Sequence, residues 1–463
     1  MTPKSVIAIF DIGKTNKKLF LFDEQYGIVL EKSKQFPETV DEDGDPCEDL
    51  PALTQWVKDE LQEVMGMEGV MVKAVNFSTY GASFVHIGYE GQPVSPLYNY
   101  LKPFRDELKE KFFSGYGDSA LFSLQTASPP LGNLNSGLQL YGLKWEKPDL
   151  FERVRYSLHL PQYMNYLVSG TPYSDITSIG CHTALWDFAA SAYHSWVSAE
   201  GIDSKLAPVF PSDQLMPAGW GRHKLLAGVG LHDSSAALIP YLSYTTEPFV
   251  LLSTGTWCIT LNPFNQTGLT STELQQDCLC YMEYRGKPVK ASRLFAGYDH
   301  EQQIKRMSDH FGVPVDHYKT VQFEPALVAC LQQYDPVPSN GQAGTLMPES
   351  RFAKRELSQF NSYELAYHQL IRDLMVQQVA STDLVMQEGT TKKIFVDGGF
   401  GRNPVYMNLL AEAYPALDVY AASVAQASAI GAAMAVHAHW NGEVLPADLI
   451  QLKHYPAGRA VSI

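Results

Sequence analysis

The stretch that decides the fold is IAIFDIGKTNKKLFLFD, residues 7–23. Its Gly13-Lys14-Thr15 looks like the end of a P-loop, the glycine-rich turn that cradles phosphate at the start of a helix. A P-loop needs a second glycine five residues before Gly13, but Ala8 stands there. Aliphatic and aromatic runs on both sides are typical of strands. The sequence therefore predicts strand, tight turn and strand, a β-hairpin.

The second half of the chain begins with a similar phrase, PFVLLSTGTWCITLNP, residues 248–263. It again predicts a strand, a turn with glycine and threonine, and a strand, which makes a weak internal repeat. Two such turns could face one another across a cleft and offer backbone N–H and threonine hydroxyl groups to phosphate. Ordinary turn geometry is the alternative explanation for each of them.

Composition limits the classes of protein that need to be considered. The chain has 463 residues, enough for two domains or one large one, and 45% of them are hydrophobic. The net charge is −15, from 35 basic and 50 acidic residues. Nucleic acids and anionic membranes need a basic face, so neither is expected as a main partner.

The sequence predicts no exported or membrane-spanning segment. Asp11 ends the short N-terminal apolar run, so no signal peptide is expected. Residues 420–440 are apolar but rich in small and polar side chains, which favours a closely packed internal helix over a membrane span. The six cysteines have neither disulfide-framework nor zinc spacing. We expect reduced thiols in a cytoplasmic protein.

Hydrophobic spacing gives a coarse order of elements. Residues 5–36 predict three strands, residues 52–65 a helix, and the next segment a strand that ends at Gly81, a mixed α/β beginning. Residues 137–170 are mostly helical, with a break at Pro148 and a C-terminal cap at Gly170. Residues 205–230 are rich in proline and glycine. We place a domain boundary there, giving domains 1–228 and 229–463.

Several segments together resemble one family, the FGGY carbohydrate kinases of the actin-like, ribonuclease H-like ATPase superfamily. In chain order the segments are DIGKTNKK, NFSTYGASFVHIGYEGQPVSPLYNY, SGLQLYGLKWEKPDLFERV, LPQYMNYLVSGTPYSDITSIGCHTALWD, GVGLHDSSAAL, LSTGTW, VDGGFGRNPVYMNLLAE and QASAIGAAMAV. The resemblance implies an α/β fold with two actin-like domains, each a mixed sheet flanked by helices, and a cleft between them. It implies ATP and Mg²⁺ as cofactors and a small-molecule sugar as substrate, and it leaves a homodimer open.

The resemblance assigns the central chemistry to two carboxylates. Asp233 matches the family's catalytic base, because a carboxylate can accept the proton of a sugar hydroxyl as phosphorus is attacked. From the residues alone, Asp233 could equally be the N-cap of the helix that follows. Asp11 ends a buried strand and is assigned to Mg²⁺, through water. Its alternative role is to hydrogen-bond the following turn.

The resemblance also supplies a set of nucleotide- and phosphate-binding residues, most of them in or beside glycine turns. They are Gly13, Thr15, Asn16, Lys18, Gly255, Thr256, Gly398, Gly399 and Asn403. Turn geometry alone could explain the glycines, and Asn403 could be a helix cap. Lys14 stands where the family has a small residue, so its role remains open.

The sugar contacts are expected in the first domain, facing Asp233. The matching positions are Thr79, Tyr80, Gly81, Ser83, Asn99 and His232, together with Asp233 itself. Relatives often carry an acidic residue in place of Ser83, and an Asp and an Arg near Tyr100 and Lys102. The usual Asn-Glu-Gly is also missing around residues 278–282. The lone histidines His182 and His300 are interpreted as structural.

The resulting hypothesis is an ATP-dependent kinase that phosphorylates a ketose while two domains close and exclude water. Trp257 and its surroundings resemble the rhamnulokinase and fuculokinase subgroup, which favours L-rhamnulose or L-fuculose. One alternative is a sugar-sensing protein that keeps the fold but not the turnover. A second is an actin- or chaperone-like ATPase that does not act on sugar.

Overall fold

The computed structural model describes residues 3–220, 223–331, 350–387, 389–424 and 426–458. The chain divides into two compact units. The first unit comprises residues 1–244, 280–288 and 425–449, and the second comprises residues 245–279, 289–424 and 450–463. This division differs from the predicted single cut after residue 228, because helix α9 (Asp233–Tyr244) and two later segments pack with the first unit.

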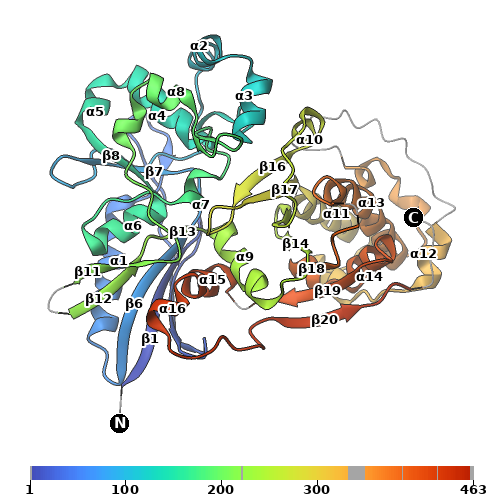
Figure 1. The fold of residues 1–463 in the computed structure, drawn as a ribbon. Helices are drawn as coiled ribbons and strands as arrows, with labels where there is room; N and C mark the ends of the chain where they lie inside the picture. The colour runs from blue at the N-terminus through green and yellow to red at the C-terminus, as the bar shows by residue number, and fades with distance from the viewer. Residues whose placement is uncertain (1–2, 221–222, 332–349, 388, 425, 459–463) are drawn as a thin grey trace. The chain divides into compact units, whose positions relative to one another are not determined.

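The first unit is built on a mixed sheet in the order β11-β12-β6-β1-β2-β3, with β13 also paired to β6. Strands β1 and β2 are antiparallel, whereas β6 runs parallel to β1, β12 and β13. Figure 1 shows β6 and β1 side by side near the centre of this sheet. The bounds are β1 Lys4–Ile12, β2 Lys17–Asp23, β3 Ile28–Lys34, β6 Val70–Thr79, β11 Leu215–Trp220, β12 His223–Gly228 and β13 Leu231–His232.

The predicted opening hairpin is confirmed, and its central strand is buried on both faces. On one face of β1, Phe10 meets the Trp56 ring of α1 edge-on, with the centroids 5.5 Å apart. On the other face Asn76 of β6, opposite Ile9, donates to the carbonyl of Ala432 in α15 at 2.8 Å. This double coverage explains why residues 6–10 form an almost continuous apolar run rather than an alternating one.

The remaining elements of the first unit are helices and short two-stranded sheets. The helices are α1 Leu50–Met65, α2 Asp106–Tyr116, α3 Ser119–Thr126, α4 Ser136–Glu146, α5 Pro148–Arg153, α6 Leu160–Ser169, α7 Ile176–Ile179, α8 Ser195–Ala199, α9, α15 Ala427–Ala435 and α16 His437–Trp440. The short strand pairs are β4 Thr39–Val40 with β5 Pro46–Cys47, β7 Phe84–Gly88 with β8 Val154–His159, and β9 Trp186–Asp187 with β10 Ala192–Tyr193. The predicted break at Pro148 and the left-handed cap at Gly170 are confirmed.

Two sequence interpretations need correction. The Pro- and Gly-rich segment 205–230, in which a domain boundary was predicted, instead contains β11 and β12, which extend the first sheet. The helix expected over residues 420–440 is shorter, because strand β19 (Asp418–Ser423) occupies the beginning of that segment. Close packing is correct for α15 itself. A Cβ on Gly431 would stand 1.8 Å from the carbonyl oxygen of Ala236 in α9, so only glycine allows this approach.

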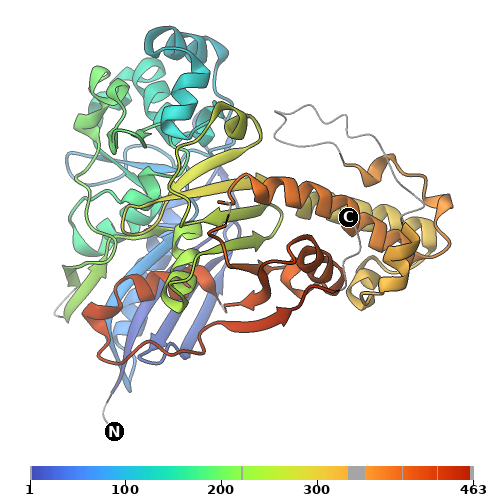
Figure 2. The ribbon, with the colours of Figure 1, turned by 45° about the vertical axis from the view of Figure 1, so that its right-hand side comes forward.

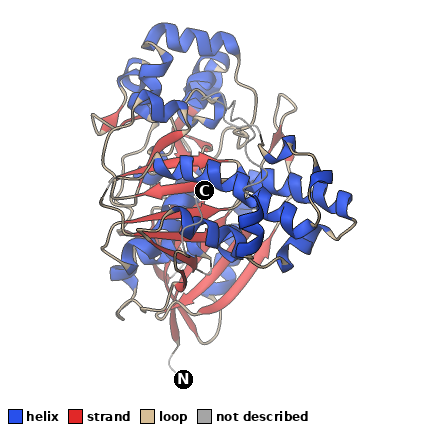
Figure 3. Ribbon diagram, turned by 90° about the vertical axis from the view of Figure 1, so that its right-hand side faces the viewer, coloured by secondary structure: helices blue, strands red, loops and turns tan. Residues whose placement is uncertain are grey.

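The second unit has its own mixed sheet in the order β16-β17-β15-β14-β18-β19-β20. Its strands are β14 Phe249–Thr254, β15 Cys258–Asn262, β16 Cys278–Met282, β17 Pro288–Leu294, β18 Lys393–Gly398, β19 and β20 Gln451–Tyr455. Residues of β14, β18 and β19 share an apolar core with helices of this unit. Figures 2 and 3 show the same ribbon from two further sides, with helices and strands distinguished in Figure 3. The helices are α10 Ser271–Gln275, α11 Ala296–Phe311, α12 Pro325–Leu331, α13 Tyr363–Asp383 and α14 Pro404–Ala413, with short 3₁₀ turns η3 Val315–Thr320 and η7 Phe400–Arg402.

A helix needs about 20 predominantly apolar residues to span a bilayer. Within the described parts of the chain, no helix combines the length and the apolar character needed to span a membrane.

Candidate active site

Two carboxylates lie at the same edge of the first unit's sheet. Asp11 is the second-last residue of β1 and pairs in register with Ser78 of β6. Asp233 directly follows β13, whose His232 pairs with Thr79, the last residue of β6. Because β1, β6 and β13 are parallel, their carboxyl ends meet at one edge, the usual place for a ligand in such sheets.

Electrostatics at this edge favour a bound cation. The pKa of the Asp11 carboxyl is raised to about 6, mainly by burial and in smaller part by the negative charge of Asp233. A hydrogen bond of 3.0 Å from the Ser428 hydroxyl to Asp11 Oδ2 acts in the opposite direction. Two carboxylates that repel one another are stabilised by a divalent cation between or beside them. The residues present therefore fit Mg²⁺, which uses one or two carboxylates and keeps several waters.

Asp233 is the first residue of α9 and 38% of its side chain is exposed. Its Oδ1 accepts a hydrogen bond of 2.6 Å from the backbone N–H of Ser234, so the carboxylate braces the first turn of the helix. Within the described residues, Oδ2 of Asp233 has no hydrogen-bond partner. One oxygen is thus positioned by the helix and the other is available to accept a proton.

His232 lies between Asp233 and a buried thiol. Its Nε2 is 3.5 Å from Asp233 Oδ1 and 3.5 Å from Cys181 Sγ. Burial lowers the pKa of His232, against the opposing charge of Asp233, so the ring is neutral at pH 7. A Cβ on Gly81 would stand 2.7 Å from the His232 ring, so this glycine makes room for the histidine. The structure therefore brings together the predicted residues Gly81, His232 and Asp233.

The other predicted sugar positions fall into two groups. Thr79 ends β6, Tyr80 follows it directly, and both are buried. Ser83, directly before β7, is also buried. Asn99 differs, because its Oδ1 accepts from the backbone N–H of Leu101 and so stabilises a local turn. No described contact joins Asn99 to the carboxylate edge, and its sugar role stays a prediction.

The first glycine turn connects β1 to β2. The Gly13 N–H donates to the Asn16 carbonyl at 2.9 Å within the turn, so this N–H is already engaged. Thr15 and Asn16 are exposed, and Asn16 Oδ1 accepts from Gln35 at 2.6 Å. Lys18 contacts Glu31 at 3.1 Å and Gln426 at 3.3 Å. The phosphate role of these residues stays a prediction, although Thr15 and Asn16 are accessible for it.

The second glycine turn, between β14 and β15, is also confirmed as a hairpin. The Gly255 N–H donates to the Trp257 carbonyl at 2.9 Å, and Thr256 accepts from the Tyr298 N–H at 3.1 Å. The start of α11 packs closely on this turn, because a Cβ on Gly297 would stand 1.8 Å from the Gly255 carbonyl oxygen. Gly255 and Thr256 remain exposed.

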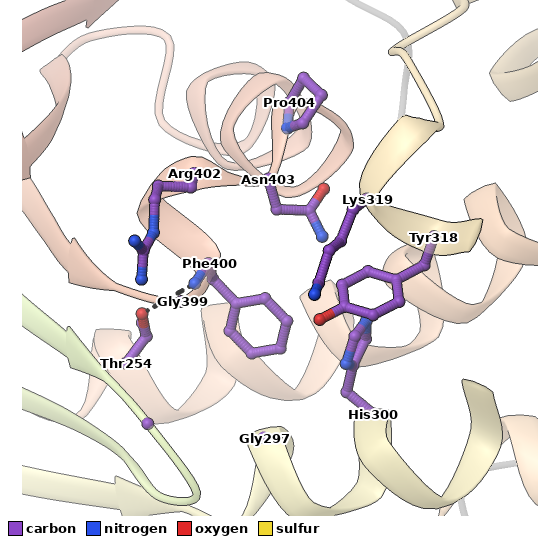
Figure 4. Close-up of a pocket in the computed structure, with 11 residues that line it drawn as sticks. Thr254, Gly297, His300, Tyr318, Lys319, Gly399, Phe400, Arg402, Asn403 and Pro404 are labelled. Carbon is purple, nitrogen blue, oxygen red and sulfur yellow. Dashed lines mark hydrogen bonds between the residues drawn. The ribbon is translucent and has the colours of Figure 1, made fainter. Parts of the chain in front are cut away.

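This turn opens onto a cavity of about 610 Å³ in the second unit (Figure 4). Three predicted nucleotide-binding residues line it, namely Gly255, Gly399 and Asn403. Gly398 is needed for a different reason. It has φ +90°, and a Cβ there would stand 2.0 Å from the Thr254 carbonyl oxygen, so it lets β18 approach β14. Thr256 and Gly398 are not among the lining residues.

Asn403 has both of the roles considered from the sequence. Its Oδ1 accepts from the Val405 and Tyr406 N–H groups and caps α14. Its Nδ2 donates to the Tyr367 hydroxyl at 2.7 Å, and His300 Nε2 is 3.0 Å from the same hydroxyl. Burial lowers the pKa of His300 to about 4, so its ring is neutral. This network fixes one wall of the cavity.

Sequence reasoning missed several lining residues. They are Thr254, Gly297, His300, Tyr318, Lys319, Phe400, Arg402 and Pro404. Figure 4 shows Lys319, Tyr318 and His300 on one side, Arg402 near Thr254 on the other, and the Phe400 ring between them. Lys319 comes from η3, which is remote in sequence from the glycine motifs, so no local signal marks it. Arg402 follows Gly401 in the recognised motif and could have been included.

A cavity with an aromatic ring, a carboxamide and two cations has the chemistry to hold a nucleotide. Residues 246–443 match the family described as carbohydrate kinase FGGY, C-terminal domain. This segment of the chain is therefore similar to the C-terminal domain of the FGGY carbohydrate kinases. The matched segment contains the cavity and the second glycine turn, and the match confirms the family resemblance on that part of the chain.

Curated proteins similar to this chain include two rhamnulokinases. That of Halalkalibacterium halodurans is 23% identical over 265 residues, covering 54% of this chain and 52% of the relative. That of Bacteroides thetaiotaomicron is 25% identical over 264 residues, covering 54% and 53%. The chain thus matches about half the length of these relatives.

Solved structures of other kinases share the fold over almost the whole chain. A carbohydrate kinase from Novosphingobium aromaticivorans has a TM-score of 0.82 at 21% identity, covering 99% of this chain and 95% of that one. A xylulose kinase from Rhodospirillum rubrum has a TM-score of 0.76 at 16% identity, covering 98% and 94%. The predicted fold class, two α/β domains that each have a mixed sheet flanked by helices, is confirmed.

Proposed function

We propose that the protein transfers the γ-phosphoryl group of ATP to a hydroxyl of a ketose. The observation that carries the proposal is the pair Asp11 and Asp233, two carboxylates at one sheet edge of the first unit. The FGGY match of the second unit, with its cavity, supports ATP as the donor. The rhamnulokinase relatives make a 6-deoxyketohexulose such as L-rhamnulose or L-fuculose the first candidate.

In the proposed reaction, the sugar hydroxyl oxygen attacks the γ-phosphorus. A new P–O bond forms, the bond from γ-phosphorus to the bridging oxygen breaks, and that oxygen's electron pair leaves with ADP. Asp233 accepts the hydroxyl proton on Oδ2, while the Ser234 N–H holds Oδ1. Neutral His232 lies beside the carboxylate and adds no competing charge.

Asp11 is proposed to hold Mg²⁺ through water. When bound, the ion neutralises charge on the phosphate oxygens. Its charge would also lower the pKa of Asp11, which burial otherwise raises to about 6. Ser428 positions the Asp11 carboxylate for this role through the hydrogen bond to Oδ2.

The nucleotide is proposed to occupy the second unit's cavity. The Phe400 ring and neutral His300 offer apolar and aromatic surface, whereas Lys319 and Arg402 offer positive charge. Thr254 fixes the glycine motif, because its hydroxyl accepts from the Phe400 N–H and its carbonyl accepts from the Gly399 N–H. This bracing preorganises the cavity before ligand binds.

A coupled ADP-release assay tests the proposal against L-rhamnulose, L-fuculose, both xyluloses, both ribuloses and glycerol. We expect release with at least one ketose. Asp233→Ala should fold as the wild type but lose turnover by about 10²–10⁴-fold, since it removes the general base. Near wild-type turnover would refute the role of Asp233. Sugar binding without ADP release would favour a sensor, and ATP hydrolysis without sugar would favour the non-sugar ATPase.

A further inference from the structure

Lys14 stands in the β1–β2 turn, and neither the motif nor the proposed reaction assigns it a role. Its Nζ is 3.0 Å from Glu38 Oε1. The same ammonium lies 5.9 Å from the centroid of the Tyr80 ring and 6.0 Å from that of Tyr100. The two rings meet edge-on with centroids 6.2 Å apart. The Lys14 ammonium therefore lies against the rings of Tyr80 and Tyr100, which together form an aromatic wall.

This wall and the proposed metal carboxylate lie on different faces of the sheet. Asp11 and Lys18 are register partners on β1 and β2, so their side chains share a face. That face is covered by α15 and by the residue before it, because Asp11 contacts Ser428 and Lys18 contacts Gln426. Lys18 is thus the lysine of this hairpin whose side chain lies on the same face of the sheet as Asp11.

Lys17, the residue before Lys18 in β2, points to the opposite face of the sheet. Its Nζ is 2.6 Å from Glu48 Oε1 and donates to the Lys14 carbonyl at 2.9 Å. Glu48 Oε2 accepts from the Tyr80 hydroxyl at 3.2 Å and is 3.9 Å from Lys14 Nζ. Lys14 is therefore held on the face of Lys17 and Glu48, away from the Asp11 side chain.

The aromatic wall also lies beside the proposed base. Tyr80 directly follows Thr79, which pairs with His232, the neighbour of Asp233. Burial raises the pKa of Tyr100, the charge of Lys14 lowers it, and the charge of Asp233 raises it. The Tyr100 phenol is thus within electrostatic reach of both Lys14 and Asp233.

We propose that Lys14 is a specificity-determining residue of the acceptor subsite and contacts the sugar rather than the phosphates of ATP. The ammonium donates hydrogen bonds to sugar oxygens, and Glu38 accepts them from sugar hydroxyls. The rings of Tyr80 and Tyr100 cover the C–H face of the sugar. The inference rests on the proposed kinase function, because it assumes a sugar acceptor next to Asp233.

The charges of the subsite define the class of sugar. Lys14 and Lys17 are balanced by Glu38 and Glu48, so the group carries no net charge. An acidic sugar would have to compete with Glu38 for the Lys14 ammonium. A neutral polyhydroxy ketose can use both members of the Lys14–Glu38 pair at once. We therefore expect neutral ketoses to be preferred over sugar acids.

The test compares Lys14→Met with wild type and with Lys34→Met. Lys34 is a matched control, because its Nζ also lies 6.0 Å from an aromatic centroid, that of Phe36, but on strand β3. Sugar and ATP affinities are measured separately by calorimetry, and both KM values by ADP release. We expect Lys14→Met to raise the sugar Kd and KM about tenfold and to change the ATP Kd less than about twofold. Lys34→Met should change neither.

Three results would overturn the inference. A weakened ATP Kd with unchanged sugar affinity would assign Lys14 to the phosphates. Unchanged affinity for both ligands would make it a surface residue. If the wild type binds and phosphorylates no sugar in the panel, the proposed function fails and the subsite with it. That failure is recognised in the wild type, before any variant is compared, so it is distinct from a failure of Lys14 alone.

Discussion

The buried ion pair beneath the opening turn offers a sharp test of the fold. The Lys17 side chain is 1% exposed and that of Glu48 is 5% exposed, and their charged atoms are 2.6 Å apart. Glu48 also accepts a hydrogen bond from the Tyr80 hydroxyl, so the ion pair helps to position a residue of the proposed acceptor subsite. Each ion has lost its hydration, and each is tolerated only because the other is present.

Glu48→Gln keeps the shape of the side chain but removes its charge. The Lys17 ammonium is then buried without a counter-charge, which we expect to lower the free energy of unfolding by about 3–5 kcal/mol. Urea unfolding measures the change, and hydrogen exchange of β1 and β6 amides assigns it to the first unit. Local readout is needed because a chain with two units need not unfold in a single step.

Two controls separate charge burial from loss of a contact. The double variant Lys17→Met/Glu48→Leu should recover most of the lost stability, because an apolar pair of similar volume needs no hydration. Glu301→Gln, which removes an exposed partner of Lys305, should leave unfolding unchanged. The reasoning is refuted if Glu48→Gln unfolds within about 1 kcal/mol of wild type, or if the double variant is less stable than Glu48→Gln.

Three further predictions concern single side chains. Burial raises the pKa of Asp175 to about 6, so the unfolded chain loses this proton first and the residue's contribution to stability falls as pH rises from 4 to 6. We therefore expect the free energy of unfolding of Asp175→Asn, measured in urea, to rise relative to that of wild type by about 2–3 kcal/mol between pH 4 and pH 6. If the difference between the two proteins stays constant over this range, the prediction is wrong. Gly431→Ala forces a Cβ onto the Ala236 carbonyl and should lower the free energy of unfolding by about 1–3 kcal/mol in the same assay. Gly442→Ala is the control, because a Cβ there meets no atom within 4 Å, and it should leave the free energy of unfolding unchanged. Asn403→Ala removes the cap of α14 and should lower the free energy of unfolding by about 1 kcal/mol, and it should also weaken ATP binding measured by calorimetry. Asn403→Asp should keep the cap. An unchanged free energy of unfolding in Asn403→Ala would refute the stabilising role of the cap.

Local patterns were sufficient for much of the fold and for the choice of Asp11 as a candidate site residue. Strands on both sides of Gly13 and Gly255, the break at Pro148 and the cap at Gly170 depend on residues close in sequence, and all are confirmed. Asp11 was identified because it lies near the end of a buried strand, where a charged residue is unexpected. The role of Asp233 came from the family resemblance, since its local sequence fits a helix N-cap equally well. The glycine near His232 was identified, but not the reason for it.

Other features depend on contacts between distant residues, which no local pattern encodes. The segment 420–440 is divided between β19 and α15, because one part pairs with β18 and the other packs on α9. Lys319 joins the cavity from a short turn remote from the glycine motifs.

The opening stretch shows the same division. The sequence by itself determined that residues 7–23 form a hairpin and not a P-loop, because glycine spacing and strand propensity are local properties. Only the tertiary structure decided where its lysines point. Alternation along β2 sends Lys17 and Lys18 to opposite faces, and the buried Glu48 and the rings of Tyr80 and Tyr100, brought in by other elements, set the position of Lys14.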